Sequence, residues 1–372
     1  MAHVFIVSEK TLPIHLKYKF AGTGAKDLSC EFLFNNDIEI NWARENLLCG
    51  MIADISRIRI GDKVIFYLLQ TDKHDGMFFG SFKVKGKPFL SNDDYLKDEL
   101  GKNLTFRVEL EPDEVYSKGI TERECLDSLE NIHHPSELCW SLIYRKLKAN
   151  RGCTMITDFE YNKIMDKIRS RNKNITIDGL NFSYDNILNE ITKDNISHSY
   201  CGIKESLKIN SRLIYKKQHN RSYEVHLQDY ILQNLENISI LNNNNIPITW
   251  IGNEVSCGVG MQSMDICFCQ ETKNELNIMV CELKDEQPIQ HIFDQLRIYI
   301  NWIIEYIIPT YKKRIKIYPI IIAPKPKEKV AKMFTENKSI FECKKNNYDI
   351  NKIRYIYFDE TKDNNLTFNE EG

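Results

Sequence analysis

Two acidic residues and a lysine lie on either side of a predicted hairpin, where their side chains could act together. The hairpin turn is centred on Lys273 and Asn274. Antiparallel pairing about that turn places Asp265 opposite Glu282, with Cβ atoms about 4.5–5.5 Å apart. Side chains alternate along a strand, so Lys284 shares a face with Glu282. The spacing therefore predicts two carboxylates and an ammonium around one point.

This set of charges is typical of metal-assisted phosphodiester hydrolysis. Two carboxylates at such a distance repel each other, and each resists ionisation unless a cation lies between them. Mg²⁺, with Mn²⁺ as a substitute, takes oxygen ligands and commonly binds one or two carboxylates together with phosphate oxygens. Lys284 could assist an attacking water or stabilise charge on the scissile phosphate. The alternative is a surface ion pair, but apolar strands disfavour three inward charges that serve structure alone.

The elements that must position these residues alternate between helix and strand. A helix is predicted over 222–237, strands over 261–269 and 277–284, a long helix from Pro288 to about Ile307, and a strand over 316–323. This order predicts an α/β core with a central mixed sheet flanked by helices. We expect the acidic tail after Phe358 to fray.

The first 120 residues differ, because short apolar runs there alternate with turns. Strands are predicted over 4–7, 63–69, 77–84 and 104–110. Their β-branched and aromatic content indicates a small β-barrel or a strongly bent sheet.

Helices and polar loops occupy the middle of the chain. One helix is predicted over 136–148 and another over 157–170, where Thr157 and Glu160 have the spacing of a capping box. Basic residues gather within 145–151 and 204–221. Such runs are either solvated helix faces or a grip on phosphates. The candidates for contact with a DNA backbone are Arg145, Lys146, Lys148, Arg151, Lys216 and Lys217.

The composition of the chain restricts the classes of protein to which it can belong. The chain has 372 residues with 50 Lys and Arg against 52 Asp and Glu, so any nucleic-acid surface must be local. Eleven scattered cysteines without a C-x-x-C pair indicate reduced thiols and a cytoplasmic protein. The apolar run 4–7 is too short for a secretory leader. The stretch 298–309 contains Asn301 and Glu305, so we expect no membrane span.

The hairpin motif, Asp265 followed by Glu282-Leu283-Lys284, resembles that of the PD-(D/E)XK nucleases. Residues 223–230 are similar to the helix that opens the core in relatives of mismatch-specific endonucleases and archaeal Holliday-junction resolvases. The resemblance covers about 216–325. It implies a restriction-endonuclease-like fold in which Glu224 joins Asp265 and Glu282 as a metal ligand. It also implies that Gln295 lines the site, for which a surface amide is an equal alternative.

A second resemblance lies in residues 1–118. The segments 44–46, 60–67 and 80–84 are similar to EVE domains of the PUA-like superfamily, kin to the YTH readers. That family implies a bent barrel that holds a flipped, often modified base against aromatic rings. Trp42 and Tyr67 would line this pocket, although a tyrosine on an apolar strand also suits a core.

Together these observations predict a base-reading domain (1–118), a basic helical connector (119–215) and a nuclease domain (216–372). The resulting hypothesis is a modification-dependent, restriction-type endonuclease that cleaves double-stranded DNA with Mg²⁺. A single site per chain would require a homodimer or a transient dimer to cut both strands. The alternatives are a sequence-specific or structure-specific endonuclease acting on mismatches or junctions, and a nucleic-acid reader without catalysis.

Overall fold

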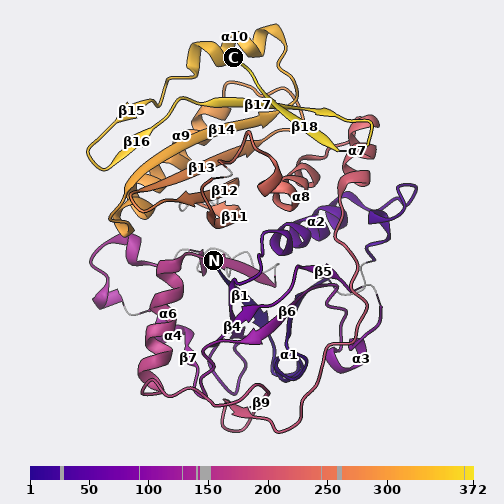
Figure 1. Cartoon of the computed structure of the whole chain (residues 1–372), viewed down its shortest axis with the longest axis vertical. Helices are drawn as coiled ribbons and strands as arrows, with labels where there is room; N and C mark the ends of the chain where they lie inside the picture. Colours follow the sequence, from indigo (N-terminus) through magenta and orange to yellow (C-terminus); the bar gives the residue numbers. More distant parts are fainter. Residues whose placement is uncertain are drawn as a thin grey trace. The chain divides into compact units, whose positions relative to one another are not determined.

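The computed structural model divides the chain into two compact units, each built around its own sheet (Figure 1). The first unit comprises Met1–Cys30, Asn41–His133 and Leu138–Leu207, and the second comprises Glu31–Ile40, His134–Glu137 and Lys208–Gly372. The structure describes residues 1–25, 29–91, 93–127, 129–139, 141–142, 152–243, 245–257, 262–363 and 365–372.

The first unit is a mixed sheet with short helices. Its strands follow the order β2-β6-β4-β3-β1-β8, with β5 on β6 and β7 on β4. The strands are β1 (Ala2–Val7), β2 (Phe20–Thr23), β3 (Lys63–Leu68), β4 (Met77–Val84), β5 (Phe89–Leu90), β6 (Phe106–Pro112), β7 (Ile120–Thr121), β8 (Cys153–Ile156), β9 (Phe182–Asp185) and β10 (Glu190–Lys193). The helices are α1 (Leu12–Tyr18), α2 (Trp42–Ser56), α3 (Lys97–Leu100), α4 (Glu122–Leu126), the 3₁₀ turn η2 (Leu129–Asn131) and α6 (Asp158–Arg171).

This sheet curls into a half-barrel, which confirms the expectation of a bent sheet. β1 and β3 run parallel, whereas β3 and β4 form an antiparallel pair. Strands β3 and β4 carry mostly apolar side chains on both faces, because each face of these strands is buried in the fold. On one face, Val4, Ile65 and Phe78 pack against Ile164 and Met165 of α6.

The segment expected as a helical connector contributes to the first unit as far as Leu207. Strand β8 pairs antiparallel with β1 and so extends the sheet. Helix α6 begins at the predicted capping box, in which Thr157 and Glu160 each accept a hydrogen bond from the other's backbone N–H. The helix expected over 136–148 falls mainly on residues outside the described part of the chain.

The second unit contains a mixed sheet in the order β11-β12-β13-β14-β16-β15, with β17 pairing with β14 and β18. The strands are β11 (Ile248–Ser256), β12 (Ser263–Glu271), β13 (Glu275–Leu283), β14 (Arg314–Ala323), β15 (Cys343–Lys344), β16 (Tyr348–Ile350), β17 (Arg354–Glu360) and β18 (Leu366–Glu370). The helices are η1 (Glu31–Leu33), η3 (Pro135–Glu137), α7 (Asn210–Gln218), α8 (Glu224–Asn234), η4 (Leu235–Asn237), α9 (Ile292–Trp302), a π-helical turn η5 (Ile303–Ile307), η6 (Ile308–Thr310) and α10 (Glu328–Asn337).

The predicted α/β core is present in this unit. β11, β12 and β13 run antiparallel, and β14 runs parallel to β13. Helix α8 packs against β13, and α9 packs against β13 and β14. None of the described helices is long and apolar enough to span a membrane.

Two expectations about this unit are corrected. Helix α9 begins at Ile292 rather than Pro288, because Gln287 is held by hydrogen bonds to the backbone of Lys325 and Lys327. The tail does not fray, since β18 pairs with β17. The Glu370 carboxylate accepts hydrogen bonds from the Arg354 guanidinium, the closest at 2.6 Å, which offsets the acidity of this segment.

Candidate active site

The predicted hairpin forms, with the predicted register. Ile266 pairs with Cys281 and Glu271 pairs with Leu276, and Thr272 and Glu275 close the turn. The pairing of β12 with β13 ends at Ile266, one position short of Asp265. There the Asp265 Oδ2 atom accepts a hydrogen bond of 2.7 Å from the backbone N–H of Leu283. The acidic side chain thus lies where the pairing of β12 with β13 stops, next to the end of β13.

Glu282 is held from two sides. It is only 2% exposed. Its Oε1 accepts from the Lys284 ammonium at 2.8 Å, and its Oε2 accepts from the Tyr299 hydroxyl at 3.0 Å. Tyr299 is a buried residue of α9, so that helix helps to orient the carboxylate. A buried carboxyl group needs hydrogen-bond partners, and each oxygen of Glu282 has one.

Helix α8 contributes Glu224, whose Oε2 lies 3.7 Å from Nζ of Lys284. No side chain caps α8 from its own N-cap position. Instead, Oδ2 of Asp285 accepts hydrogen bonds from Oγ of Ser222 at 2.6 Å and from the backbone N–H of Tyr223 at 2.9 Å. Because Asp285 directly follows Lys284, this carboxylate ties the start of α8 to the end of β13.

A second bond fixes α8 against β12. The buried amide of Gln228 donates from Nε2 to the backbone carbonyl of Asp265 at 2.7 Å. Leu227 and Ile231 are fully buried on the same helix. The three carboxylates expected at the site therefore come from three elements that are bonded to one another.

The electrostatics of the cluster reflect crowded negative charge. Burial, followed by the charges of Glu282 and Glu224, raises the pKa of Asp265 well above its ordinary value. Burial also raises the pKa of Glu224 to about 7, with Lys284 opposing the rise and Asp285 adding to it. For Lys284, burial lowers the pKa, but the carboxylates of Glu282 and Asp265 more than offset it, so the pKa lies above normal.

The carboxyl oxygens of this cluster are of the kind that a hard divalent cation prefers, although the described side chains are not arranged around a metal position. Carboxyls whose ionisation is suppressed by their neighbours are stabilised by a nearby positive ion, and carboxylate oxygens are the ligands that Mg²⁺ prefers. In the described residues the ammonium of Lys284 is in contact with Glu282 and Glu224. No group of three or more His, Cys, Asp or Glu side chains in that part of the chain is arranged to hold a metal. A bound metal ion would add positive charge to that of Lys284.

Gln295, Tyr299 and Asp285 show which residues near the cluster the sequence motifs identify and which they omit. Gln295 is half-buried on α9, one helical turn before Tyr299, and the described residues show no hydrogen bond to its side chain. Tyr299 and Asp285 were not predicted as site residues. The signal for Tyr299 is its spacing of four from Gln295, which puts both on one helix face. Asp285 has no such signal, because its partners lie more than 60 positions away.

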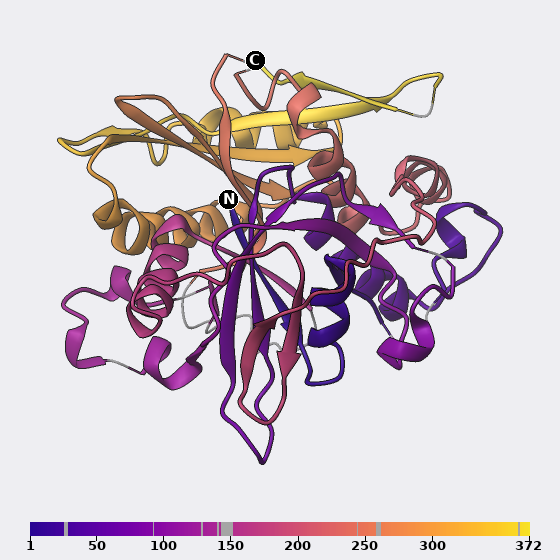
Figure 2. The same ribbon diagram turned by 60° about the horizontal axis from the view of Figure 1, so that its bottom comes forward.

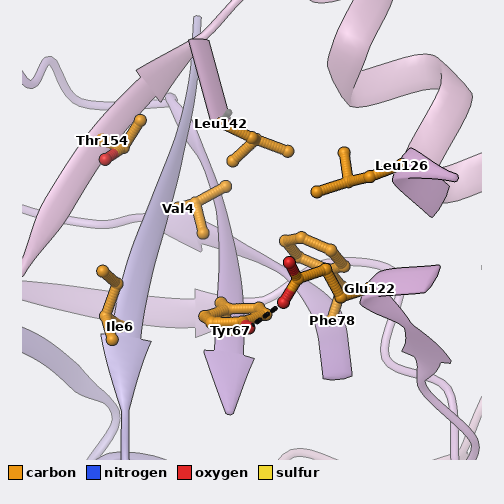
Figure 3. Close-up of a pocket in the computed structure, with 8 residues that line it drawn as sticks. All are labelled: Val4, Ile6, Tyr67, Phe78, Glu122, Leu126, Leu142 and Thr154. Carbon is orange, nitrogen blue, oxygen red and sulfur yellow. Dashed lines mark hydrogen bonds between the residues drawn. The ribbon is translucent and has the colours of Figure 1, made fainter. Parts of the chain in front are cut away.

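In the first unit, Tyr67 lines a small cavity of about 30 Å³ (Figure 3). Its hydroxyl donates a hydrogen bond to Glu122, and burial followed by that carboxylate raises its pKa. The other walls are Val4, Ile6, Phe78, Leu126, Leu142 and Thr154. The volume is enough for water but not for a nucleobase. Tyr67 is 5% exposed and belongs to the core cluster, which favours the alternative interpretation of this tyrosine as a core residue.

The remaining predicted contacts are placed differently. Trp42 is the first residue of α2, is 63% exposed, and is not part of the Tyr67 cavity. Lys216 is buried, and Lys217 forms an ion pair of 3.1 Å with Glu360, so neither presents an unengaged ammonium for a phosphate. Contact of these two residues with a DNA backbone stays a prediction, and Lys217 would have to exchange Glu360 for a phosphate. The other four candidates, Arg145, Lys146, Lys148 and Arg151, lie outside the described residues.

Comparison with known proteins adds two distant similarities. The sequence matches no family model and no curated protein. A hypothetical protein from Leishmania major is 13% identical with a TM-score of 0.29, over 46% of this chain and 95% of that one. The human THYN1 protein, solved in complex with 5-methylcytosine-containing DNA, is 13% identical with a TM-score of 0.23, over 45% of this chain and 96% of that one. At these values neither structure decides the fold or the function of this chain.

Proposed function

We propose that this chain is a divalent-metal-dependent DNA endonuclease, in which the second unit cleaves phosphodiester bonds and the first unit selects DNA with a modified base. The observation that carries the proposal is the cluster of Glu224, Asp265, Glu282 and Lys284. The carboxyls come from α8, β12 and β13, and burial together with their mutual repulsion opposes the ionisation of Asp265 and Glu224, while the adjacent ammonium of Lys284 partly offsets this effect. Perturbed carboxyls beside a lysine at strand ends favour a catalytic role over a structural one.

Each side chain of the cluster has its own role in the proposed mechanism. Asp265, Glu282 and Glu224 would hold Mg²⁺ or Mn²⁺, which when bound would polarise the phosphate and activate water. Lys284 keeps its proton at neutral pH because its pKa is raised, so it would stabilise negative charge rather than act as a base. In the metal-free protein Glu224 has a pKa of about 7, so metal binding at this carboxyl would compete with a proton near neutrality. Tyr299 would keep Glu282 oriented.

The test is cleavage of a panel of phage DNAs that carry different base modifications, with unmodified plasmid alongside, in Mg²⁺ and in Mn²⁺. We expect cleavage of at least one modified DNA, and its loss in Glu282→Ala. The matched control is Glu286→Ala, which removes an exposed acid four positions along the chain. No cleavage of any DNA, or full activity in Glu282→Ala, would refute the catalytic assignment. Cleavage of unmodified plasmid at a fixed sequence would support the sequence-specific alternative instead.

A further inference from the structure

Residues 324–327 form a short loop, Pro-Lys-Pro-Lys, that leads from the end of β14 into α10. Strand β14 runs parallel to β13, and the two strands lie side by side in orange in Figure 2. Their pairing continues to Leu283 and Ile322, and the backbone N–H of Lys284 donates to the carbonyl of Ile322 at 2.9 Å. The loop therefore leaves the sheet at the end where Glu282 and Lys284 lie.

The loop is bonded to the segment that follows β13. The side chain of Gln287 donates from Nε2 to the carbonyl of Lys325 at 3.0 Å, and its Oε1 accepts from the backbone N–H of Lys327 at 2.9 Å. The Tyr355 hydroxyl donates to the carbonyl of Pro324 at 2.8 Å. The prolines of the loop restrict its backbone further, because each ring fixes its own φ angle. A loop held in this way loses little entropy when it binds a partner.

The loop and the first turn of α10 carry positive charge at every second position. Lys325, Lys327 and Lys329 are exposed, and Glu328 is the only acidic residue of the sequence 324–335. In the part of the chain that the structure describes, none of these three ammonium groups forms an ion pair with a carboxylate. By contrast, Lys316 of β14 pairs with Glu275 at 2.9 Å. Unpaired positive charges within five positions favour an anionic partner.

An aromatic ring orients one of these lysines. Nζ of Lys325 lies 5.7 Å from the centre of the Tyr357 ring. The ring attracts the ammonium without taking the place of a hydrogen-bond acceptor, so the three N–H donors remain available to a ligand. An ammonium in this state suits a phosphate oxygen, which lysine binds as a point charge.

We infer that residues 324–329 bind the phosphate backbone of duplex DNA beside the bond that is cleaved. Duplex DNA presents a closely spaced row of phosphates, so lysines on a fixed loop contact it without regard to base sequence. The bonds from Gln287 would keep this contact in register with Glu282 and Lys284, so that backbone binding places a phosphodiester at the cluster. This inference rests on the proposed cleavage of DNA and specifies which surface of the second unit holds the substrate.

The test measures binding of the full chain to a fluorescein-labelled duplex of about 20 base pairs in EDTA, by anisotropy, over a range of salt concentrations. Each phosphate contact contributes about 0.9 to the slope of log K against log salt concentration. We expect Lys325→Gln/Lys327→Gln to reduce the size of that slope by about 2 and to weaken binding about 10–100-fold at low salt. Lys325→Arg/Lys327→Arg, which keeps both charges, should retain the wild-type slope.

The matched control is Lys344→Gln/Lys345→Gln, which removes the same charge from two exposed lysines of the β15–β16 hairpin. Strand β16 pairs with β14 at Ile315, near the beginning of that strand, so this hairpin lies at the opposite end of β14 from the loop (Figure 1). The control should leave the slope unchanged.

The outcomes separate this surface from the cleavage activity. No binding of the duplex by the wild-type chain, an unaltered slope in Lys325→Gln/Lys327→Gln, or an equal decrease in the control would overturn the assignment of this surface. A chain that shows the expected slopes but cuts none of the DNAs in the cleavage panel would overturn the nuclease proposal and leave the surface as a DNA-binding site.

Discussion

Replacing Glu224 with glutamine should make the metal-free protein more stable while removing a metal ligand. The pKa of this carboxyl is about 7, against an ordinary value of 4.5, so at high pH the folded protein holds an unfavourable charge. A difference of about 2.5 pH units corresponds to at most about 3.4 kcal/mol at 1.36 kcal/mol per pH unit. The side chain is 36% exposed, so solvent screening reduces the expected gain to about 1–2 kcal/mol.

The sign of the pH dependence follows from the direction of the shift. Below about pH 4.5 the carboxyl is protonated in both folded and unfolded protein, and it carries no penalty. Between 4.5 and about 7 the folded state binds more protons than the unfolded state, so the wild-type protein loses stability as the pH rises. The gain from Glu224→Gln should therefore be small at pH 4.5 and complete above pH 7.

The assay is urea unfolding in EDTA at pH 4.5 and at pH 8, repeated at pH 8 with Mg²⁺. Glu286→Gln, a neutralisation of a nearby exposed acid, is the control. We expect Mg²⁺ to stabilise the wild-type protein more than Glu224→Gln, because a ligand of the folded state raises stability by mass action. A variant no more stable than wild type at pH 8, or one with equal gains at both pH values, would refute the account of a frustrated acidic cluster.

Two further outcomes follow from the hydrogen bonds around the cluster. Asp285→Ala releases the start of α8 and should raise the Mg²⁺ concentration for half-maximal cleavage about 10–100-fold. An unchanged metal titration would show that Asp285 does not position Glu224. Tyr299→Phe removes one donor to Glu282 and should lower the free energy of unfolding by about 1–3 kcal/mol in urea titrations. An unaltered unfolding midpoint would mean that this carboxylate finds another donor.

The hairpin of the second unit was predictable because its constraints are local. The polar turn after Glu271 sets the pairing, and side chains alternate along the strands, so the facing of Asp265 and Glu282 follows from the turn position alone. Helix α6 was predictable for a similar reason, since Thr157 and Glu160 form a capping box within one turn. Both features depend on residues within about 20 positions of each other.

Features that depend on distant packing were not predictable. Lys216 lies in a basic run of the sequence, yet the fold buries it, while Trp42 belongs to an apolar type and is exposed. The tail after Phe358 looked too acidic to be ordered, but Arg354 pairs with it across a strand. The amino-acid type of a residue does not show which distant residue will contact it in the folded chain.

The sequence by itself determined which charged residues share the end of one hairpin, because strand alternation and a short turn leave a single register. Only the tertiary structure decided how those charges are balanced. Tyr299 reaches Glu282 from α9, and Asp285 holds α8, through contacts 17 and more than 60 positions apart. Only the tertiary structure, likewise, placed the lysines of residues 324–329 next to the end of β13, since α9 separates the two segments along the chain and the pairing of β13 with β14 brings them together.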